Sequence, residues 1–428
     1  MARGDGFTHA KGFPWHGPRG RIFKRQQALK NCMRKARGKS HGLEKADGRA
    51  MGMAAAARAL ALASALSLAA APSAAAAAAA GVVAPYAGQP AAQSARQAAA
   101  PASGSGASAK AAPPAASNID LNALASKAGV SVQALQYAIS QARYQQKIID
   151  AITRPSEGKP WYQYRRIFIT RERIDAGVSF YLSHRESLQK AFKLYGVPPE
   201  IVCAIIGVET FYGRSMGTWA VLDALYTLGF HYPKRAAFFS QEFASFVKLC
   251  LKEGWDIGAV KGSYAGAMGM GQFMPSSYLN FAVDADGDGR EDLFKSADDA
   301  IFSVANYFKM HGWQAGRGIC YAVHLDGADG EALKAKGWDL TAGEFYAAGA
   351  STKVAIPSSE NMRVYTYDLE DGTQSVLAAL ANFKAITRYN TSPLYARAVF
   401  ELSEYIRMGY VKAMARQGVY VKPEGRRP

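Results

Sequence analysis

The segment that most constrains the fold runs from Val197 to Arg214 and reads VPPEIVCAIIGVETFYGR. Pro198 and Pro199 suit the first turn of a helix, where a missing backbone N–H costs no hydrogen bond. The residues that follow are apolar almost all round a helix, which is typical of a helix buried on every side. The segment therefore predicts a buried helix around which the chain is organised, with Gly213 as its stop.

Beyond the first turn, where Glu200 lies, a single acid, Glu209, interrupts this apolar helix. It falls on the same side as Val202 and Ile206, at helical spacing. Because burial disfavours the charged form, a carboxyl group among apolar neighbours resists ionisation and is suited to donate a proton near neutral pH. Two structural alternatives stay open: a buried Glu paired with an Arg, and an acid at a frayed helix end that faces water.

The net charge of +17 over 428 residues is concentrated at the start of the chain, where residues 1–50 hold 13 Lys and Arg against three Asp and Glu. A nucleic-acid-binding arm is one interpretation of this basic extension. We prefer the interpretation that residues 1–50 are not translated. Residues 51–80 have the positive flank, short apolar core and small residues of a secretory signal peptide, which belongs at an N-terminus. The remaining charge suits an anionic polymer, such as a cell wall or nucleic acid, without selecting between them.

Residues 81–117 are rich in Ala, Pro and Ser and bury too little apolar surface to offset their ordering entropy, so they predict a disordered linker. Beyond them, spacing and capping residues predict helices at 131–152, 170–181, 188–196, 236–250, 297–310 and 395–408, with a further return to helix near residue 375. Residues 160–168 are aromatic and predict an extended segment. Short alternating stretches at 321–325, 354–356 and 363–369 predict a small antiparallel sheet.

The four cysteines, Cys32, Cys203, Cys250 and Cys320, show neither zinc-site spacing nor a small disulfide framework. Cys203 and Cys250 lie in apolar helical runs and predict core packing. A single disulfide stays open.

A glycine-rich stretch, GSYAGAMGMGQFMPSSY, covers Gly262 to Tyr278. Its glycines let the backbone approach a ligand closely. Their order, and the absence of a preceding predicted strand, argue against a dinucleotide-binding loop. Gln272 either binds a substrate amide or a water, or satisfies the backbone of a tight turn.

An acidic stretch beginning at Asp284 has the spacing of a calcium loop. Asp284, Asp286 and Asp288 occupy positions 1, 3 and 5, Gly289 takes the sharp turn, and the carbonyl of Arg290 serves position 7. Lys295 stands where a bidentate Glu is expected, so Asp298 or Asp299 is needed to complete the site. We expect structural calcium here; the alternative is an acidic surface turn.

Five motifs then occur in an order and spacing similar to those of the membrane-bound lytic transglycosylase B family of bacterial cell-wall enzymes. They are GVETFYGR, GSYAGAMGMGQFMPSSY, the DxDxDG loop, SVANYF and ITRYNTSPLYA. The resemblance covers roughly residues 120–412. It implies a mainly α fold, with a goose-lysozyme-like helical core, a helical N-terminal extension, a small inserted antiparallel β lobe and an EF-hand-like calcium loop. The catalytic domain would be residues 118–412, with the β lobe at about 317–372 and a basic tail at 413–428.

The activity implied by the resemblance is cleavage of the β-1,4 bond between N-acetylmuramic acid and N-acetylglucosamine in peptidoglycan. The product is a 1,6-anhydromuramic acid end, formed without water. Glu209 matches the family's single catalytic acid, which protonates the glycosidic oxygen and then, as a carboxylate, takes the proton from the muramic O6. Most glycosidases use two carboxylates; in this family the substrate's own N-acetyl group would take the place of the second.

The resemblance also assigns the residues that contact substrate. Ser263 and Gln272 match positions near the cleaved bond, and Tyr389 and Asn390 match a pair that lines the same site. Groove positions that stack on sugar or hold peptide stems are matched by Tyr164, Arg235, Tyr307 and Tyr395. For each Tyr, core packing is the alternative. Lys234 and Phe238 depart from the family's common Arg and Tyr, which affects fine substrate contacts.

The resemblance further implies calcium with no organic cofactor, peptidoglycan glycan strands as the partner, no nucleic acid, and a monomer, with other cell-wall synthesis and hydrolysis proteins as candidate partners. No lipid-anchor cysteine follows the signal, so we expect a soluble periplasmic form. Three other functions are weighed against the transglycosylase: a non-catalytic peptidoglycan-binding scaffold, a calcium-regulated interaction protein, and a muramidase that shares every site residue and differs only in its product.

Overall fold

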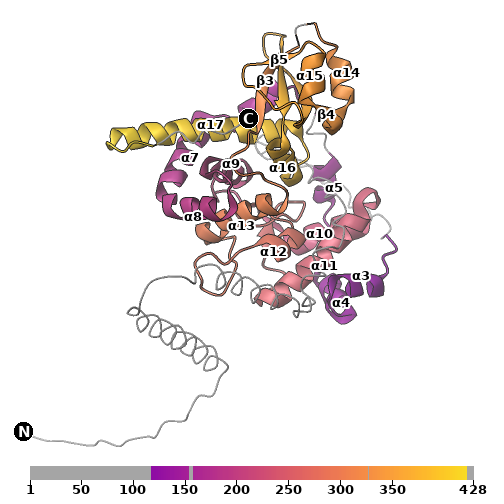
Figure 1. Ribbon diagram of the computed structural model, residues 1–428. Coiled ribbons are helices and arrows are strands. Elements are labelled where there is room, and N and C mark those ends of the chain that lie inside the picture. Colours follow the sequence, from indigo (N-terminus) through magenta and orange to yellow (C-terminus); the bar gives the residue numbers. More distant parts are fainter. Residues whose placement is uncertain (1–116, 154–157, 326, 422–428) are drawn as a thin grey trace, which may run out of the picture. The chain divides into compact units, whose positions relative to one another are not determined.

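The structure, a computed structural model, describes residues 117–153, 158–325 and 327–421 (Figure 1). The predicted basic extension, the signal peptide and nearly all of the linker lie outside these residues. Within them, no single helix has the length and apolar composition to cross a membrane. One pair of helices, α8 (Arg185–Tyr195) and α9 (Pro199–Thr210), meets that test together but is bent by 113°.

Three short helices begin the described chain: α3 (Leu121–Ala128), α4 (Val132–Gln141) and α5 (Gln146–Thr153). Ser131 caps α4 as predicted, since its side chain accepts from the N–H of Ala134. The single helix predicted for residues 131–152 is wrong. Between α4 and α5, the N–H of Arg143 bonds to Asp223 and the N–H of Gln145 bonds to Thr227, so side chains of α10 satisfy the backbone at the break.

The segment predicted to be extended, residues 160–168, is instead the helix α6 (Trp161–Phe168). Its buried side chains Trp161, Tyr164 and Phe168 recur at helical spacing on one face, and packing of that face outweighs the aromatic preference for a strand. Next come α7 (Arg171–Ser183), which Thr170 caps as predicted, and α8 (Arg185–Tyr195), which ends at Gly196.

The predicted central helix is α9 (Pro199–Thr210), and each of its residues is buried. It packs against α7, α8, α13 (Ala297–Met310) and the long α17 (Pro393–Arg416), and Figure 1 shows it enclosed among them. The remaining helices of the main core are α10 (Val221–His231), η3 (Pro233–Arg235), α11 (Ala236–Glu253), α12 (Pro275–Phe281) and α16 (Ala381–Tyr389). Cys203, Cys250 and Cys320 are buried free thiols, which confirms core packing for the first two.

A five-stranded antiparallel sheet confirms the predicted β lobe. Its order is β4-β6-β7-β3-β5, formed by β3 (Cys320–His324), β4 (Leu340–Thr341), β5 (Ser351–Thr352), β6 (Asn361–Asp368) and β7 (Gln374–Ala379). The helix predicted near residue 375 is wrong, because β7 pairs with β6 on one side and β3 on the other. Residues 354–356, predicted to be a strand, follow β5 without strand pairing. Three short helical elements complete the lobe: α14 (Gly330–Ala335), η4 (Gly337–Asp339) and α15 (Ala342–Ala347).

The sheet has a hydrophobic core on each face. Alternate residues of β6 and β7 point to opposite faces. Tyr367 and Ala379 therefore join the main helical core, whereas Val364 and Ala378 join a second, smaller core that includes Phe345. A separate two-stranded ladder, β1 (Trp219–Ala220) with β2 (Lys261–Gly262), fixes the start of the glycine-rich stretch.

Candidate active site

Glu209 is the next-to-last residue of α9, and it is only 6% exposed. Its Oε1 accepts a hydrogen bond of 2.6 Å from the hydroxyl of Tyr395. Tyr395 stands in the first turn of α17, which Ser392 caps. Burial, and after it the neighbouring carboxylate of Glu209, raises the pKa of Tyr395 well above its ordinary value. The phenol therefore stays protonated and is a permanent donor to the acid.

The end of α9 is held by a cluster on its far side. Phe211, Tyr212 and Gly213 all have positive φ, at 53°, 60° and 83°, and for the two aromatic residues this backbone is strained. Arg173 of α7 holds them in place: its Nε donates to the carbonyl of Gly207 at 3.1 Å, and its own carbonyl accepts from the hydroxyl of Tyr212 at 3.0 Å. The predicted stop at Gly213 is thus three residues late, because these contacts end the helix at Thr210.

Gly207 has a packing role in this cluster. A Cβ at this position would lie 2.5 Å from the hydroxyl of Tyr212, so only glycine lets the chain fold back over the helix. Arg173, Gly207 and Tyr212 set the position of the acid two residues away. The apolar pattern of α9 gives no signal for the role of Arg173, which comes from a different helix.

Thr210 joins the acid's helix to the glycine-rich loop. Its hydroxyl donates to the carbonyl of Met270 at 2.8 Å and accepts from the N–H of Gly213 at 2.9 Å. Within the loop, the Oγ of Ser263 accepts from the N–H of Ala267 at 3.0 Å, so this buried hydroxyl shapes the turn. The sequence analysis did not single out Thr210.

Gln272 is buried and has a φ of 52°, a backbone conformation that few residues other than glycine adopt. Its Nε2 donates to the carbonyls of Met216 and Gly269, each at 3.0 Å. These contacts satisfy backbone in a tight turn, one of the two roles that the sequence left open. They also bring the segment at Met216 against the loop.

Tyr389 of α16 reaches the same loop from the opposite side. Its hydroxyl donates to the carbonyl of Gly271 at 2.5 Å, and burial, followed by the charge of Glu209, raises its pKa well above the ordinary value. Tyr307 lies against Tyr389 with ring centroids 4.8 Å apart and donates to the carbonyl of Arg388. Asn390 accepts from the N–H of Ser392 at 3.0 Å and so shapes the turn before α17.

The other two predicted groove residues lie on different elements. Tyr164 of α6 is buried, and its proximity contributes to the raised pKa of Tyr395. Arg235 in η3 places its guanidinium over the rings of Phe238 and Phe239, at 4.6 and 4.9 Å, and burial lowers its pKa. The structure thus brings Glu209, Tyr395, Tyr389 and Tyr164 together, with Tyr307 beside Tyr389.

Glu209 is the buried acid that faces this tyrosine cluster. The described residues contain three other buried acids. Glu200 lies nine residues earlier on α9, about 13 Å along the axis. Glu242 accepts from the N–H and hydroxyl of Ser276, and Asp299 lies in the acidic loop. The arrangement therefore supplies one proton donor, held by a hydroxyl, beside a loop with a close-packed backbone.

The sequence matches the family described as Transglycosylase SLT domain over residues 115–404. It is 39% identical to membrane-bound lytic murein transglycosylase B of Escherichia coli (strain K12) over 305 residues, which are 68% of this chain and 82% of that protein. The chain belongs to this family of lytic transglycosylases. Membership confirms the resemblance drawn from the five motifs, and makes the protein a lyase that cleaves peptidoglycan.

Two solved structures extend the likeness of this transglycosylase to the fold. One is Escherichia coli lytic transglycosylase Slt35 in complex with calcium, with a TM-score of 0.61 and 38% identity over 68% of this chain and 92% of that one. The other is SltB3 from Pseudomonas aeruginosa in complex with NAG-NAM-pentapeptide, with a TM-score of 0.59 and 28% identity over 67% of this chain and 78% of that one. They confirm the mainly helical, lysozyme-like fold.

Among the residues that the structure describes, one cluster of acids is suited to a cation. Oxygen atoms of Asp284, Asp286 and Asp299 lie within 4.8 Å of one another, a set of hard ligands that fits calcium. Both Asp299 oxygens also accept backbone N–H groups, from Ala285 at 2.9 Å and Asp292 at 2.7 Å. Burial raises the pKa of Asp299, and the charge of Asp286 adds to the effect.

The other predicted ligands take different places. The carboxylate of Asp288 accepts from the N–H of Arg290 at 2.8 Å and is not part of the cluster. Asp298, the alternative to Asp299, is also outside it. Of the two acids that the sequence offered to complete the loop, Asp299 is therefore the one that the fold places beside Asp284 and Asp286.

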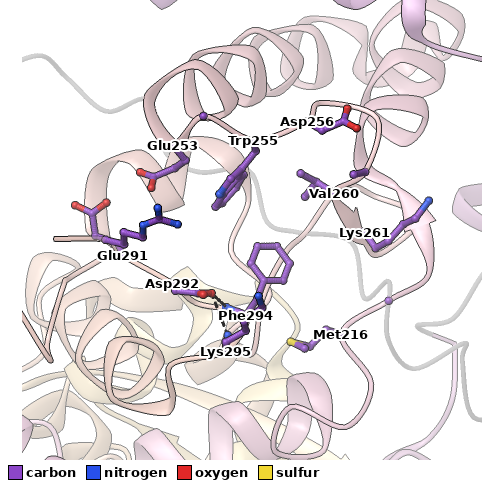
Figure 2. Close-up of a pocket in the computed structure, with 14 residues that line it drawn as sticks. Met216, Glu253, Trp255, Asp256, Val260, Lys261, Glu291, Asp292, Phe294 and Lys295 are labelled. Atoms are coloured by element: carbon purple, nitrogen blue, oxygen red, sulfur yellow. Dashed lines mark hydrogen bonds between the residues drawn. The ribbon is translucent and has the colours of Figure 1, made fainter. Parts of the chain in front are cut away.

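A cavity of about 580 Å³ has no part of the Glu209 cluster in its lining; Figure 2 shows the residues that line it. It lies between the segment at Met216, the end of α11 and residues 290–295. Trp255 and Phe294 project into it, and charged side chains such as Glu253 and Lys261 surround them. Neither Glu209 nor Tyr395 lines it. This cavity is therefore separate from the cluster around Glu209.

Proposed function

We propose that Glu209 is the single catalytic acid and base of this lytic transglycosylase. The hydrogen bond from Tyr395 to its buried carboxyl group carries the proposal. As an acid, Glu209 gives its proton to the glycosidic oxygen between N-acetylmuramic acid and N-acetylglucosamine, and the C1–O bond breaks. As a carboxylate, it then takes the proton from the muramic O6 hydroxyl while O6 bonds to C1. The 1,6-anhydro ring closes, the acid is regenerated and no water is consumed.

Tyr395 has a defined part in this cycle. Its phenol donates to Oε1, and a hydrogen bond to a charged acceptor is roughly twice as strong as one between neutral groups. The bond therefore strengthens when Glu209 becomes a carboxylate, between the two proton transfers. Such a donor, fixed before the reaction, stabilises charge where it develops.

The substrate contacts follow from the same placement. Ser263, Gln272, Tyr389 and Asn390 shape the loop and turn beside the acid, and we assign them to the walls that hold the two sugars at the cleaved bond. Tyr164 and Tyr307 extend those walls, and Arg235 is assigned to the outer groove. The substrate strand carries peptide stems, as does the muropeptide bound to SltB3.

Calcium is the ion that we assign to Asp284, Asp286 and Asp299, in a structural role. Support comes from the clustered carboxylates and from the calcium complex of Slt35. For the location, the predicted signal peptide supports a periplasmic enzyme, acting where the peptidoglycan is.

Mass spectrometry of purified cell wall digested with the protein tests the proposed function. We expect muropeptides that end in 1,6-anhydromuramic acid, and their loss by at least about a thousandfold in Glu209→Gln, which cannot donate the proton. Glu200→Gln is the matched control, because it makes the same change in the same buried helix away from Tyr395, and it should keep activity. Reducing ends in place of anhydro ends would instead mean hydrolysis. Intact wall that sediments with the protein would favour the non-catalytic scaffold.

A further inference from the structure

A second cavity, of about 430 Å³, lies between α6, α17 and the turn that joins β6 to β7. The proposed mechanism uses none of its lining residues. Its walls combine aromatic side chains with charges of both signs: Trp161, Tyr162, Arg165, Arg166, Leu369, Glu370, Arg397 and Glu401.

The three arginines of this cavity are not equivalent. Arg165 donates its Nε to Glu401 at 2.6 Å, and Arg166 pairs with Glu370. Arg397 has no ion pair or hydrogen bond to any described residue. Its guanidinium lies between the rings of Trp161 and Tyr367, at 4.4 and 4.3 Å from their centroids, and its Nη1 is buried without a hydrogen-bond acceptor.

Arg397 is partly buried, and a charged N–H donor such as its Nη1 is unfavourable where burial has removed its hydration and supplied no hydrogen-bond acceptor. The two rings stabilise the cation and fix the plane of the guanidinium. They do not satisfy its N–H groups. An anion that enters the cavity would do so, and a carboxylate matches the fork of an arginine in both charge and shape.

The cavity is close to the candidate active site through two shared elements. On α6, Tyr164 lies near Tyr395 while Trp161, one turn away, contacts Arg397. On α17, Tyr395 and Arg397 are two residues apart and leave the helix on opposite sides. The route along α6 is the short one, because the rings of Trp161 and Tyr164 stack with their centroids 6.5 Å apart. A carboxylate joined to a bound sugar by a short chain would therefore reach Arg397 from the catalytic site.

We propose that this cavity binds a carboxylate of the peptide stem carried by the glycan strand, with Arg397 as its principal ligand. The inference rests on the proposed function, since it takes the substrate to be a stem-bearing strand. Arg397 acts here as a specificity residue for the substrate, outside the chemical step.

The test compares two substrates, stem-bearing glycan strands and the same strands after an amidase has removed the peptides and the lactyl carboxyl groups that this exposes have been amidated. For Arg397→Gln we expect KM to rise about tenfold on the stem-bearing strands, the loss of roughly one charge-assisted hydrogen bond. On stem-free strands KM should be unchanged, and kcat should be unchanged on both. Arg397→Lys, which keeps the charge and loses the fork, should fall between. Arg171→Gln is the control, since that exposed arginine of α7 lies outside the cavity.

An equal rise of KM on both substrates, or no rise on either, would overturn the inference. Melting temperatures of the variants show whether a change in KM comes from a loss of folding. If Arg397→Gln is unstable, the comparison is made with Arg397→Lys. A binding measurement separates this inference from the proposed function. NAG-NAM-pentapeptide is titrated into Glu209→Gln protein, with the same compound amidated at its carboxyls as the comparison. Amidation should weaken binding only while Arg397 is present, whether or not the wild-type protein makes anhydro ends.

Discussion

At the scale of single residues, the proposed mechanism depends on the pair Glu209–Tyr395. Burial keeps the phenol protonated, so Tyr395 has a hydrogen to donate to Oε1 whenever Glu209 is a carboxylate. A donor of this kind favours the ionised acid over the neutral one. It therefore helps Glu209 to release its proton to the glycosidic oxygen.

Replacing Tyr395 by Phe should change both the rate and its pH dependence. We expect kcat/KM for release of anhydro ends to fall by about tenfold to a hundredfold, since one hydrogen bond to a charged group is lost. Without the donor, the carboxylate is less stable and holds its proton to higher pH. The alkaline limb of the pH–rate profile, where the acid form is lost, should therefore shift upward.

The control for this experiment is Tyr410→Phe. Tyr410 lies on the same helix and stacks on Tyr181, with ring centroids 3.9 Å apart. It should leave the pH–rate profile unchanged. An alkaline limb that stays in place in Tyr395→Phe would show that the bond does not tune the acid.

At the scale of elements, the fold selects the third carboxylate of the acidic loop, which the sequence left open between Asp298 and Asp299. Asp284 and Asp286 come from the loop itself, whereas Asp299 comes from the first turn of α13. A cation bound by all three would tie that helix to the loop. An ion that binds only the folded state stabilises it by mass action, by about 2.7 kcal/mol at a hundredfold excess over its Kd.

Removal of calcium with a chelator should therefore lower the melting temperature, and added calcium should restore it. In Asp299→Asn the calcium-dependent shift should disappear, because one of the three clustered carboxylates is lost. Asp298→Asn is the matched neighbour and should keep the shift. Equal melting curves with and without calcium in the wild-type protein would argue for a loop that binds no ion.

The elements also show which parts of this fold are predictable from sequence. Helices with strong local signals, such as α9 and α13, are found from apolar spacing and caps. The strand β7 is not, because residues 374–379 give no alternating signal and are strand only through pairing with β3 and β6. Glu209 stands out as a lone acid, and the resemblance added Tyr395 to the site. The sequence does not predict the roles of Arg173, Thr210 and Arg397, because those roles depend on partners far away in the sequence.

At the scale of the whole molecule, the sheet connects two hydrophobic cores. Neighbouring residues of β7, Ala378 and Ala379, belong to different cores, so neither core can lose its packing without disturbing the same strand. The smaller core is therefore not an independent unit. We expect the catalytic region to unfold as one cooperative system.

The substitution Phe345→Ala tests this coupling. Phe345 is fully buried in the smaller core, and its truncation should cost about 3–5 kcal/mol. We expect one calorimetric transition in both the wild type and the variant, with thermal loss of activity shifted by the same amount. A separate early transition that leaves activity unaffected would show that the small core unfolds alone.

The bond between Tyr395 and Glu209 joins residues 186 positions apart, and it has a consequence for the timing of activity. During synthesis, Glu209 is added to the chain long before α17, the helix that carries Tyr395. An unfinished chain, or one cut before residue 393, carries every part of α9 and yet lacks the group that holds the acid. We therefore expect incomplete chains to leave peptidoglycan uncleaved. Activity should appear only in chains that include α17.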